Sequence, residues 1–396
     1  MHKVFLLKGK EKPVLQRHNW VFSGAIDRAD DGIQKGDIVE VLDSQNKFLA
    51  YGYFNKDSKI NIRLLEWNKD HIINDEWWFK KIEAAINLRK SLINADDTDS
   101  MRLVFSEGDS LPGLIVDQFN EYLSVQFLTA GVDVRKDIIC DALEKLVHPK
   151  GIYERSDAAA RSLEGLAKSN RLLRGDMPPD DLIIKENGWL FYMNIADGQK
   201  SGYFLDQREN RKKVAKYCKG KKLLDTFSYT GGFSINAIKA GANEVTSVDS
   251  SALASEYLKK NLSLNNISVD EHQVLTSDVF QFLRDAKKDS KNWDVIILDP
   301  PKLAPNRQSV PKAERAYKDL NMQAISLLEP GQLLVSFSCS GAISLDHLKQ
   351  IIAWAAKDAG KELQFIEDLG QAFDHPVRAA FPESLYLKGI IARILA

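Results

Sequence analysis

The stretch KLLDTFSYTGGFSINAIKAGANEVTSVDS, residues 222–250, decides the fold class. A short apolar run leads into a turn of small residues, a helical pattern then ends at Gly241, and a second apolar run follows. Strands that alternate with helices are typical of a parallel sheet covered on both faces. The stretch therefore predicts the first strand–helix–strand unit of a doubly wound, Rossmann-like α/β domain.

The same alternation continues toward the C-terminus. Apolar periodicity predicts helices over residues 252–265 and 280–288, and strands over residues 272–278, 293–301 and 332–340. The tail, residues 362–394, holds two further apolar runs, which we expect to pair antiparallel at the sheet edge. We assign residues 185–396 to this domain.

The N-terminal 184 residues follow two other patterns. Residues 1–72 read as short strands separated by glycines, with a hairpin signal at Ser44-Gln45-Asn46, so a small β-barrel is predicted. Residues 73–184 begin with a helical pattern and continue with strands, which predicts a middle α/β domain. RLLRGDMPP, residues 171–179, is interpreted as a linker.

The composition fits a globular enzyme, with 44% hydrophobic and 28% charged residues. No run of about 18 apolar residues is present, so we expect no membrane association. Three cysteines in 396 residues do not indicate a disulfide scaffold, and a reducing, cytoplasmic location is the expectation. No metal site is predicted. For the apolar pair Trp77-Trp78 we favour a core role, with a homodimer interface as the alternative.

Basic residues gather in three stretches of a chain whose net charge is −1. Residues 1–24 carry a balance of +4, residues 200–222 of +7 and residues 302–318 of +4. Such stretches are either solvated helix faces or the side of a protein that meets phosphates. Three of them in one near-neutral chain favour a polyanionic partner.

Acidic residues follow four successive strands of the predicted sheet. In doubly wound sheets the ligand lies beyond the carboxyl ends of the strands. These ends carry Asp225, Asp249, Asp278 and Asp299. Asp249 suits the two hydroxyls of a ribose, and Asp278, close to Phe280, suits an adenine.

The turn after the first strand narrows the choice of cofactor. Gly231-Gly232 lets the backbone approach a ligand closely before a helix starts, but the G-x-G-x-x-G pattern of dinucleotide-binding enzymes is absent. An acid at the ribose also fits an NAD enzyme, and a strand-end Asp by itself is more often a helix cap. Four acids in register, together with Asp299-Pro300-Pro301, favour S-adenosylmethionine.

Longer motifs extend this interpretation over nearly the whole chain. They are KGKEKP (8–13), RHNWVFSGAI (17–26), SEGDSLPGLIVDQF (106–119), IYERSD (152–157), GQKSGYFLDQREN (198–210), FSYTGGF (227–233), DPPK (299–302), FSCSG (337–341), DHPV (374–377) and FPESLYLKG (381–389). With these motifs the sequence resembles the bacterial ribosomal RNA large subunit methyltransferase I family, class I enzymes that use S-adenosylmethionine to methylate carbon 5 of a cytosine in 23S rRNA.

The resemblance implies three domains: an RNA-binding PUA domain (1–72), a middle α/β domain (73–184) and a Rossmann-like methyltransferase domain (185–396). It implies 23S rRNA as the partner. Because a target base must leave its stack, a loop, an opened helix or naked rRNA before full subunit assembly is favoured. By motif position, the implied cofactor-binding residues are Gln207, Arg208, Phe227, Ser228, Tyr229, Gly231, Asp249, Asp278 and Asp299.

Cys339 is the predicted nucleophile, at the end of the fifth strand and beside the Asp-Pro-Pro strand end. Carbon 5 of cytosine attacks a sulfonium methyl group only after a thiolate has added to carbon 6, and a base must then remove the carbon 5 proton. The alternative for Cys339 is a packed strand-end residue. Cys140 is interpreted as a buried helix residue, and Cys218 as a cysteine without a role in the chemistry.

The group that takes the proton is left open. One class of cytosine-5 enzymes has a second cysteine next to the proline after the fourth strand; here that place is Pro300-Pro301-Lys302, so Cys339 is the only candidate nucleophile. Asp299 is the leading candidate for orienting or protonating ring nitrogen 3, or for guiding the proton. Lys302 is a candidate for lowering the thiol pKa or holding a phosphate. His375 could approach the site, but the alternative is at least as well supported: a structural histidine whose hydrogen bonds are all made within the protein.

Other functions are weighed against this one. Amino-group methyltransferases have an aromatic residue after Asp-Pro-Pro or Asn-Pro-Pro to stack the flipped base, so Lys302 counts against methylation of a guanine amine. A small-molecule methyltransferase has no use for an RNA-binding module. A non-catalytic RNA-binding assembly factor is disfavoured because the cofactor motifs and the nucleophile are both intact.

Overall fold

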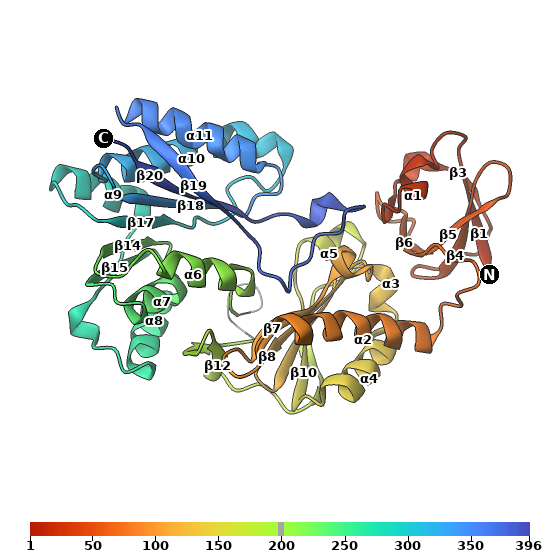
Figure 1. Cartoon of the computed structure of the whole chain (residues 1–396). Helices are drawn as coiled ribbons and strands as arrows, with labels where there is room; N and C mark the ends of the chain where they lie inside the picture. The colour runs from red at the N-terminus through yellow and green to blue at the C-terminus, as the bar shows by residue number, and fades with distance from the viewer. Residues whose placement is uncertain (197–201) are drawn as a thin grey trace. The chain divides into compact units, whose positions relative to one another are not determined.

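The computed structural model of the chain describes residues 1–196 and 202–396 (Figure 1). Contacts divide the chain into two compact units. Unit 1 consists of Met1–Ile184, Met193–Leu205 and Phe373–Ser384. Unit 2 consists of Lys185–Tyr192, Asp206–Ala372 and Leu385–Ala396, and it contains every residue predicted for catalysis or cofactor binding.

Unit 1 begins with a six-stranded sheet in the order β2-β6-β5-β4-β1-β3. Its strands are β1 (His2–Leu6), β2 (Trp20–Val21), β3 (Ile26–Ala29), β4 (Ile38–Leu42), β5 (Phe48–Phe54) and β6 (Ile62–Glu66). β4 and β5 pair antiparallel across a turn in which Asn46 has φ 66°, so the predicted hairpin is confirmed. Branched aliphatic side chains such as Val4, Val39 and Ile62 fill the core of this sheet.

A second sheet of unit 1 has five strands in the order β11-β10-β9-β8-β7. They are β7 (Ser100–Phe105), β8 (Leu114–Phe119), β9 (Tyr122–Phe127), β10 (Gly151–Ser156) and β11 (Ser169–Gly175). Helices α2 (Asp75–Leu92) and α4 (Lys136–Val147) pack against each other, and α2 packs on β7. Trp77 and Trp78 are buried in this core, which confirms their core role.

The linker predicted over residues 171–179 is wrong in its first half. β11 runs to Gly175 and pairs antiparallel with β10, with Leu172 opposite Tyr153. β11 lies at the sheet edge and most of its residues are exposed or half-exposed. An edge strand of this kind lacks the apolar alternation from which strands are predicted.

Each sheet of unit 1 has a hydrophobic core of its own. The first core consists only of residues of the N-terminal sheet and the segments next to it. The second core consists of residues from α2 to β10, together with Tyr53 and Leu65 of the first sheet. On this basis we propose that residues 1–72 and 73–184 are two domains packed together within unit 1. The boundary at residue 185 stays a prediction as well.

Unit 2 contains a seven-stranded sheet in the order β16-β15-β14-β17-β18-β20-β19. Its strands are β14 (Lys222–Thr226), β15 (Glu244–Asp249), β16 (Gln273–Thr276), β17 (Val295–Leu298), β18 (Leu333–Ser338), β19 (Leu363–Gly370) and β20 (Lys388–Ile394). The first five are parallel, and β20 is antiparallel to both β18 and β19, as predicted for the tail. The strand order reverses between β14 and β17, which is where such sheets bind ligands.

Helices cover both faces of this sheet (Figure 1). On one face lie α6 (Arg208–Ala215), α7 (Gly232–Lys239) and α8 (Ala252–Leu264); on the other lie α9 (Val279–Lys288), α10 (Val310–Ser326) and α11 (Leu345–Asp358). The predicted doubly wound architecture is confirmed. Within the described residues, no helix is both long and apolar enough to cross a membrane.

Candidate active site

The carboxyl ends of β14, β17 and β18 lie level at one edge of the unit 2 sheet. Thr226 pairs with Leu298, which in turn pairs with Ser336. The Thr226 hydroxyl donates a 2.6 Å hydrogen bond to the Ile297 carbonyl and ties the first two strand ends together. The turn after β14, the Asp299 strand end and Cys339 therefore leave the sheet at the same edge, as the sequence predicted.

The turn after β14 is conformationally strained. Phe227 has φ 56° and Tyr229 has φ 48°, values that bulky side chains rarely adopt. The Tyr229 N–H donates to Asp249 Oδ2 at 2.9 Å, and the Ser228 N–H donates to the Val248 carbonyl at 3.1 Å, so the end of β15 holds the turn. Clustered left-handed residues of this kind are typical of functional sites, where surrounding contacts offset the strain.

Gly231 and Gly232 are required by packing. Gly231 has φ 87°, and a Cβ there would lie 2.7 Å from Leu258 Cγ on α8. A Cβ at Gly232 would lie 2.5 Å from Arg211 Nε on α6. The glycines thus seat the turn between two helices, which is a reason for the doublet different from the ligand approach proposed from the sequence.

Asp225, at the end of β14, is completely buried. Its Oδ2 accepts hydrogen bonds from the Ser234 hydroxyl at 2.6 Å and from the Ser234 N–H at 3.1 Å. Its Oδ1 has no hydrogen-bond partner among the described residues. Burial raises the pKa of Asp225 to about 7, and the negative charges of Asp299 and Asp249 add to the rise. The acid therefore carries a proton in part of the molecules at neutral pH.

Asp249 and Asp278 occupy the next two strand ends. Asp249 accepts from the N–H groups of Tyr229 and Ser251, at 2.9 and 2.8 Å, and each carboxylate oxygen keeps a lone pair for a further donor. Asp278 caps α9 by accepting from the Gln281 N–H at 2.9 Å, so the helix-cap interpretation holds for it. Its carboxylate is also exposed, so capping leaves it accessible to a ligand.

Asp299 is held from α6. Gln207 Nε2 donates to Asp299 Oδ2 at 2.9 Å, while Gln207 Oε1 accepts from Asn210 Nδ2 at 2.6 Å. Asn210 also donates to the Gly370 carbonyl at 2.8 Å. Gln207 is buried, and both ends of its amide have protein partners. Asn210 was not predicted from the sequence; it occupies the end of the GQKSGYFLDQREN motif, of which residues 198–201 lie outside the described residues.

Arg208 and Arg211 correct the interpretation of the basic stretch 200–222. Both guanidinium groups are buried. Arg208 Nε lies 3.1 Å from Glu209, and Arg211 forms an ion pair with Glu186 at 2.6 Å. These two arginines are therefore part of the packing of unit 2 and do not form an exposed phosphate-facing surface.

Cys339 differs from the other two cysteines, and none of the three forms a disulfide. Cys140 and Cys218 are buried, and burial raises the pKa of each thiol to about 12. Cys339 is partly exposed, directly after β18. Because the thiolate is the reactive form, Cys339 is the thiol of this chain best placed to react.

Two residues near Cys339 were not predicted for the site. Lys388, at the start of β20, pairs with Ser338, and its Nζ donates to the Ser340 carbonyl at 3.0 Å. Tyr317 enters from α10 and is completely buried. Burial raises the pKa of Tyr317; the nearby hydroxyls of Ser338 and Ser340 lower it, and the charges of Cys339 and Asp299 raise it. The motif FPESLYLKG, which contains Lys388, was the only sequence signal for either residue.

Two further predicted residues take different positions. Lys302, after Pro300-Pro301, is exposed, and its positive charge contributes to lowering the pKa of Lys388. His375 belongs to unit 1, where it is buried with Nδ1 3.0 Å from Asp374 Oδ1 and its ring 5.2 Å from that of Phe105. His375 thus has the satisfied surroundings of a structural histidine.

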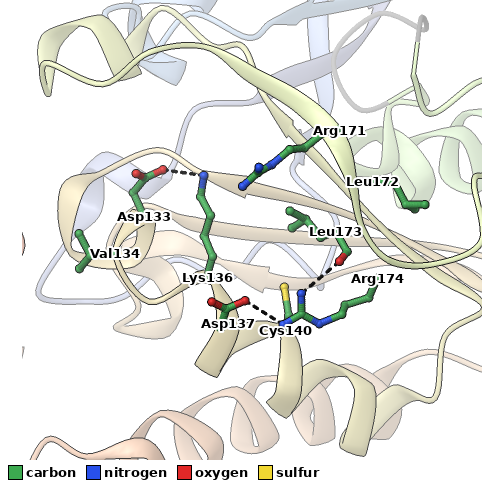
Figure 2. Close-up of a pocket in the computed structure, with 9 residues that line it drawn as sticks. All are labelled: Asp133, Val134, Lys136, Asp137, Cys140, Arg171, Leu172, Leu173 and Arg174. Carbon is green, nitrogen blue, oxygen red and sulfur yellow. Dashed lines mark hydrogen bonds and ion pairs between the residues drawn. The ribbon is translucent and has the colours of Figure 1, made fainter.

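A pocket of about 310 Å³ lies in unit 1 between α4 and β11 (Figure 2). Its cationic side chains are paired: Lys136 lies 2.7 Å from Glu154, and Arg174 lies 2.8 Å from Asp137. Arg171 lies 3.4 Å from Glu154. The pocket includes no predicted site residue, and the charge of its lining is largely neutralised.

Family models match two parts of the chain. Residues 4–67 match a PUA-like domain, and residues 169–385 match S-adenosylmethionine-dependent methyltransferases. Two relatives, from Yersinia pseudotuberculosis (serotype O:1b, strain IP 31758) and Yersinia pestis, are each 40% identical over 393 residues, covering 99% of both chains. Both relatives are named ribosomal RNA large subunit methyltransferase I.

Solved structures share the fold. A protein from Streptococcus mutans assigned as a SAM-dependent methyltransferase superposes with a TM-score of 0.85 at 23% identity, over 99% of this chain and 100% of that one. A methyltransferase complexed with SAH superposes with a TM-score of 0.86 at 24% identity over the same shares. The architecture of an N-terminal PUA-like domain and a C-terminal Rossmann-like methyltransferase domain is thereby confirmed.

Proposed function

Since the chain belongs to the ribosomal RNA large subunit methyltransferase I family and carries its S-adenosylmethionine-dependent methyltransferase domain, we propose that it methylates carbon 5 of a cytosine in 23S rRNA through Cys339. The observation that carries the proposal is the position of this thiol. Cys339 is partly exposed and leaves the sheet at the edge where Asp299 and the strained turn after β14 also emerge.

The residues at this edge fit S-adenosylmethionine, which supplies a methyl group on a sulfonium sulfur. The buried Asp225 Oδ1, which has no hydrogen-bond partner among the described residues, is open to a polar group of a ligand. Asp249 keeps lone pairs for ribose hydroxyls, and Asp278 is exposed for the adenine amino group. The rings of Phe227 and Phe280, 6.5 Å apart and nearly perpendicular, offer a flat face to a base. Gln207, Arg208, Ser228, Tyr229 and Gly231 complete the proposed set.

Cys339 acts first in the proposed reaction. Its thiolate forms a bond to carbon 6, and the electron pair of the carbon 5–carbon 6 double bond moves to carbon 5, which takes the methyl group. The carbon 5 proton is then removed by a base. The electron pair left behind restores the double bond, and Cys339 leaves as a thiolate.

Asp299 and Lys302 assist Cys339 in this proposal. Gln207 Nε2 donates a hydrogen bond to one oxygen of the Asp299 carboxyl and thereby fixes its orientation. In the proposed reaction Asp299 orients or protonates ring nitrogen 3, or guides the proton. Lys302, exposed after Pro301, stabilises negative charge on the thiolate or on an RNA phosphate.

The proposed substrate is an unpaired or flipped cytosine. The PUA-like domain at residues 4–67 would supply RNA contacts outside the active site. Flipping a base out of a stack costs a few kcal/mol, so naked rRNA or an early assembly intermediate is a better substrate than the finished subunit.

A mechanism-based trap tests the proposal. Mass mapping of rRNA from cells with and without the protein first identifies the target nucleotide, and a transcript with 5-fluorocytosine at that position is then incubated with S-adenosylmethionine. Fluorine blocks removal of the carbon 5 substituent, so we expect a denaturation-resistant protein–RNA adduct. Cys339→Ala should form none, while the matched control Cys140→Ala, which alters a buried thiol of unit 1, should form it normally. If the wild-type protein methylates the unmodified transcript yet forms no adduct, the acceptor is another atom, such as a guanine amine.

A further inference from the structure

The side chain of Lys388 spans the turn that carries Cys339. In the β18–β20 ladder Lys388 pairs with Ser338, the residue before Cys339. Its Nζ donates to the carbonyl of Ser340, the residue after Cys339, at 3.0 Å. A second hydrogen bond of 3.1 Å runs to the Tyr386 carbonyl. Lys388 thus reaches both neighbours of the nucleophile, Ser338 through the backbone ladder and Ser340 through its side chain.

β20 approaches β18 closely at this point. Gly389, the next residue, lies against Phe337, and a Cβ on Gly389 would be 2.3 Å from Phe337 Cδ1. Glycine is therefore required beside Lys388 if the two strands are to pack at this distance.

Lys388 is an uncommon residue for such a place because its side chain is buried. A buried ammonium is costly unless its N–H groups and its charge both find partners. Two carbonyls accept two of its three protons, and within residues 1–196 and 202–396 no carboxylate forms an ion pair with it. Burial lowers the pKa of Lys388; the charge of Cys339 opposes this shift, and the charge of Lys302 adds to it.

We propose that Lys388 is a positioning residue for Cys339, which holds the 338–340 turn in place and stabilises the thiolate by its positive charge. This inference rests on the proposed function of Cys339. Negative charge on the thiolate favours the ammonium, so by reciprocity the ammonium favours the thiolate. In the reaction the thiol proton leaves to solvent or base, Lys388 keeps its own protons, and its positive charge stabilises the thiolate again when Cys339 is eliminated.

The other charged groups at this corner come from two elements. Asp299 and Lys302 follow β17, and Tyr317 enters from α10. A carboxylate opposes a neighbouring thiolate, whereas an ammonium favours it. Lys302 is exposed and screened by solvent, so the buried Lys388 supplies the more effective positive charge.

The pH dependence of Cys339 alkylation tests this role. Iodoacetamide reacts with the full-length protein in the absence of RNA, and peptide mass spectrometry follows Cys339; the buried Cys140 and Cys218 serve as unreactive internal references. In Lys388→Met we expect the midpoint of the rate profile to rise by about one pH unit, which is a roughly tenfold slower reaction at neutral pH. Lys388→Arg keeps the charge and should restore most of the reactivity.

Control variants keep the test decisive. Lys349→Met removes the same charge from α11, where Lys349 pairs with Asp368 at 2.8 Å, and should leave the profile unchanged. Lys388→Gln is a second neutral variant that retains hydrogen-bond donors, and it decides the question if Lys388→Met does not fold. A folded, cofactor-binding neutral variant with the wild-type midpoint would overturn the role of Lys388 without touching the fluorocytosine adduct. If the wild-type protein formed no fluorocytosine adduct, the proposed function would be overturned, while the pH profile of Cys339 alkylation would still test the role of Lys388.

Discussion

Gln207 Nε2 donates a hydrogen bond to Asp299 Oδ2 over 2.9 Å, and the other end of the same amide accepts from Asn210. The Gln207 amide, at the N-terminus of α6, therefore fixes the Asp299 carboxyl. Asn210 holds the amide in turn, because it also donates a hydrogen bond to the Gly370 carbonyl of β19. A chain of hydrogen bonds thus connects Asp299, a candidate catalytic acid after β17, with the start of α6 and the end of β19.

Gln207→Leu should reduce the rate of methyl transfer more than the affinity for RNA. The variant keeps the side-chain volume but removes the donor to Asp299 and the acceptor for Asn210. Leaving such buried groups unpaired costs about 1–3 kcal/mol, and we expect kcat to fall about tenfold. Steady-state kinetics measure kcat, an RNA-binding titration measures the affinity for RNA, and denaturant unfolding measures the stability of the variant. Gln323→Leu, which breaks a 3.3 Å contact with Asp319 on α10, is the control and should change none of the three by much.

Cys339→Ala should abolish methyl transfer while S-adenosylmethionine binding stays within about twofold of the wild type. No other thiol can form the bond to carbon 6, because Cys140 and Cys218 are buried and their pKa values are raised to about 12. A loss of at least about a thousandfold is expected for a nucleophile. Calorimetric cofactor titration and a tritiated-methyl assay give the two readouts. Substantial residual activity would contradict covalent catalysis.

Much of the fold is predictable from the sequence because strands buried in a parallel sheet are nearly continuous apolar runs. The apolar run that opens residues 222–250 forms strand β14, Lys222–Thr226, and the helix predicted to end at Gly241 runs from Gly232 to Lys239. β11 was missed because an exposed edge strand carries little apolar pattern. Local periodicity therefore finds the elements that tertiary packing buries most completely.

The candidate site was predictable only in part, for a related reason. Asp249, Asp299 and Cys339 stand at strand ends, where the topology of the sheet places them before any contact is known. Lys388 and Tyr317 reach Cys339 from β20 and α10, and their positions depend on strand register and helix packing. Arg208 and Arg211 illustrate the opposite error, because a basic stretch counts charges without showing which of them are buried.

Gly231→Ala should weaken cofactor binding and destabilise unit 2. Two effects combine in this variant: the left-handed backbone, at φ 87°, and a contact of the new methyl group with Leu258. The backbone effect costs about 1–2 kcal/mol in an L-residue, and overpacking adds about 1–3 kcal/mol. Gly220→Ala separates them, because Gly220 has φ 70° with nothing within 4 Å of its Cβ position. Thermal unfolding and cofactor titration of both variants should show the larger loss at Gly231, and equal losses would exclude the contact as a cause.

The buried Asp225 should make unit 2 less stable as the pH rises from about 4 to about 7. Its pKa is raised from 3.8 to about 7 in the folded chain, first by burial. Below pH 4 the carboxyl is protonated in both states. Between these values the unfolded chain releases the proton while the folded chain retains it, so the free energy of unfolding falls with pH. Asp225→Asn removes this term, and the stability of the wild type relative to the variant should decline over the window by an amount on the order of a few kcal/mol. Denaturant unfolding at successive pH values measures the difference, with the exposed Asp289→Asn as the control. A difference independent of pH would mean that Asp225 is ionised in the folded protein throughout this range.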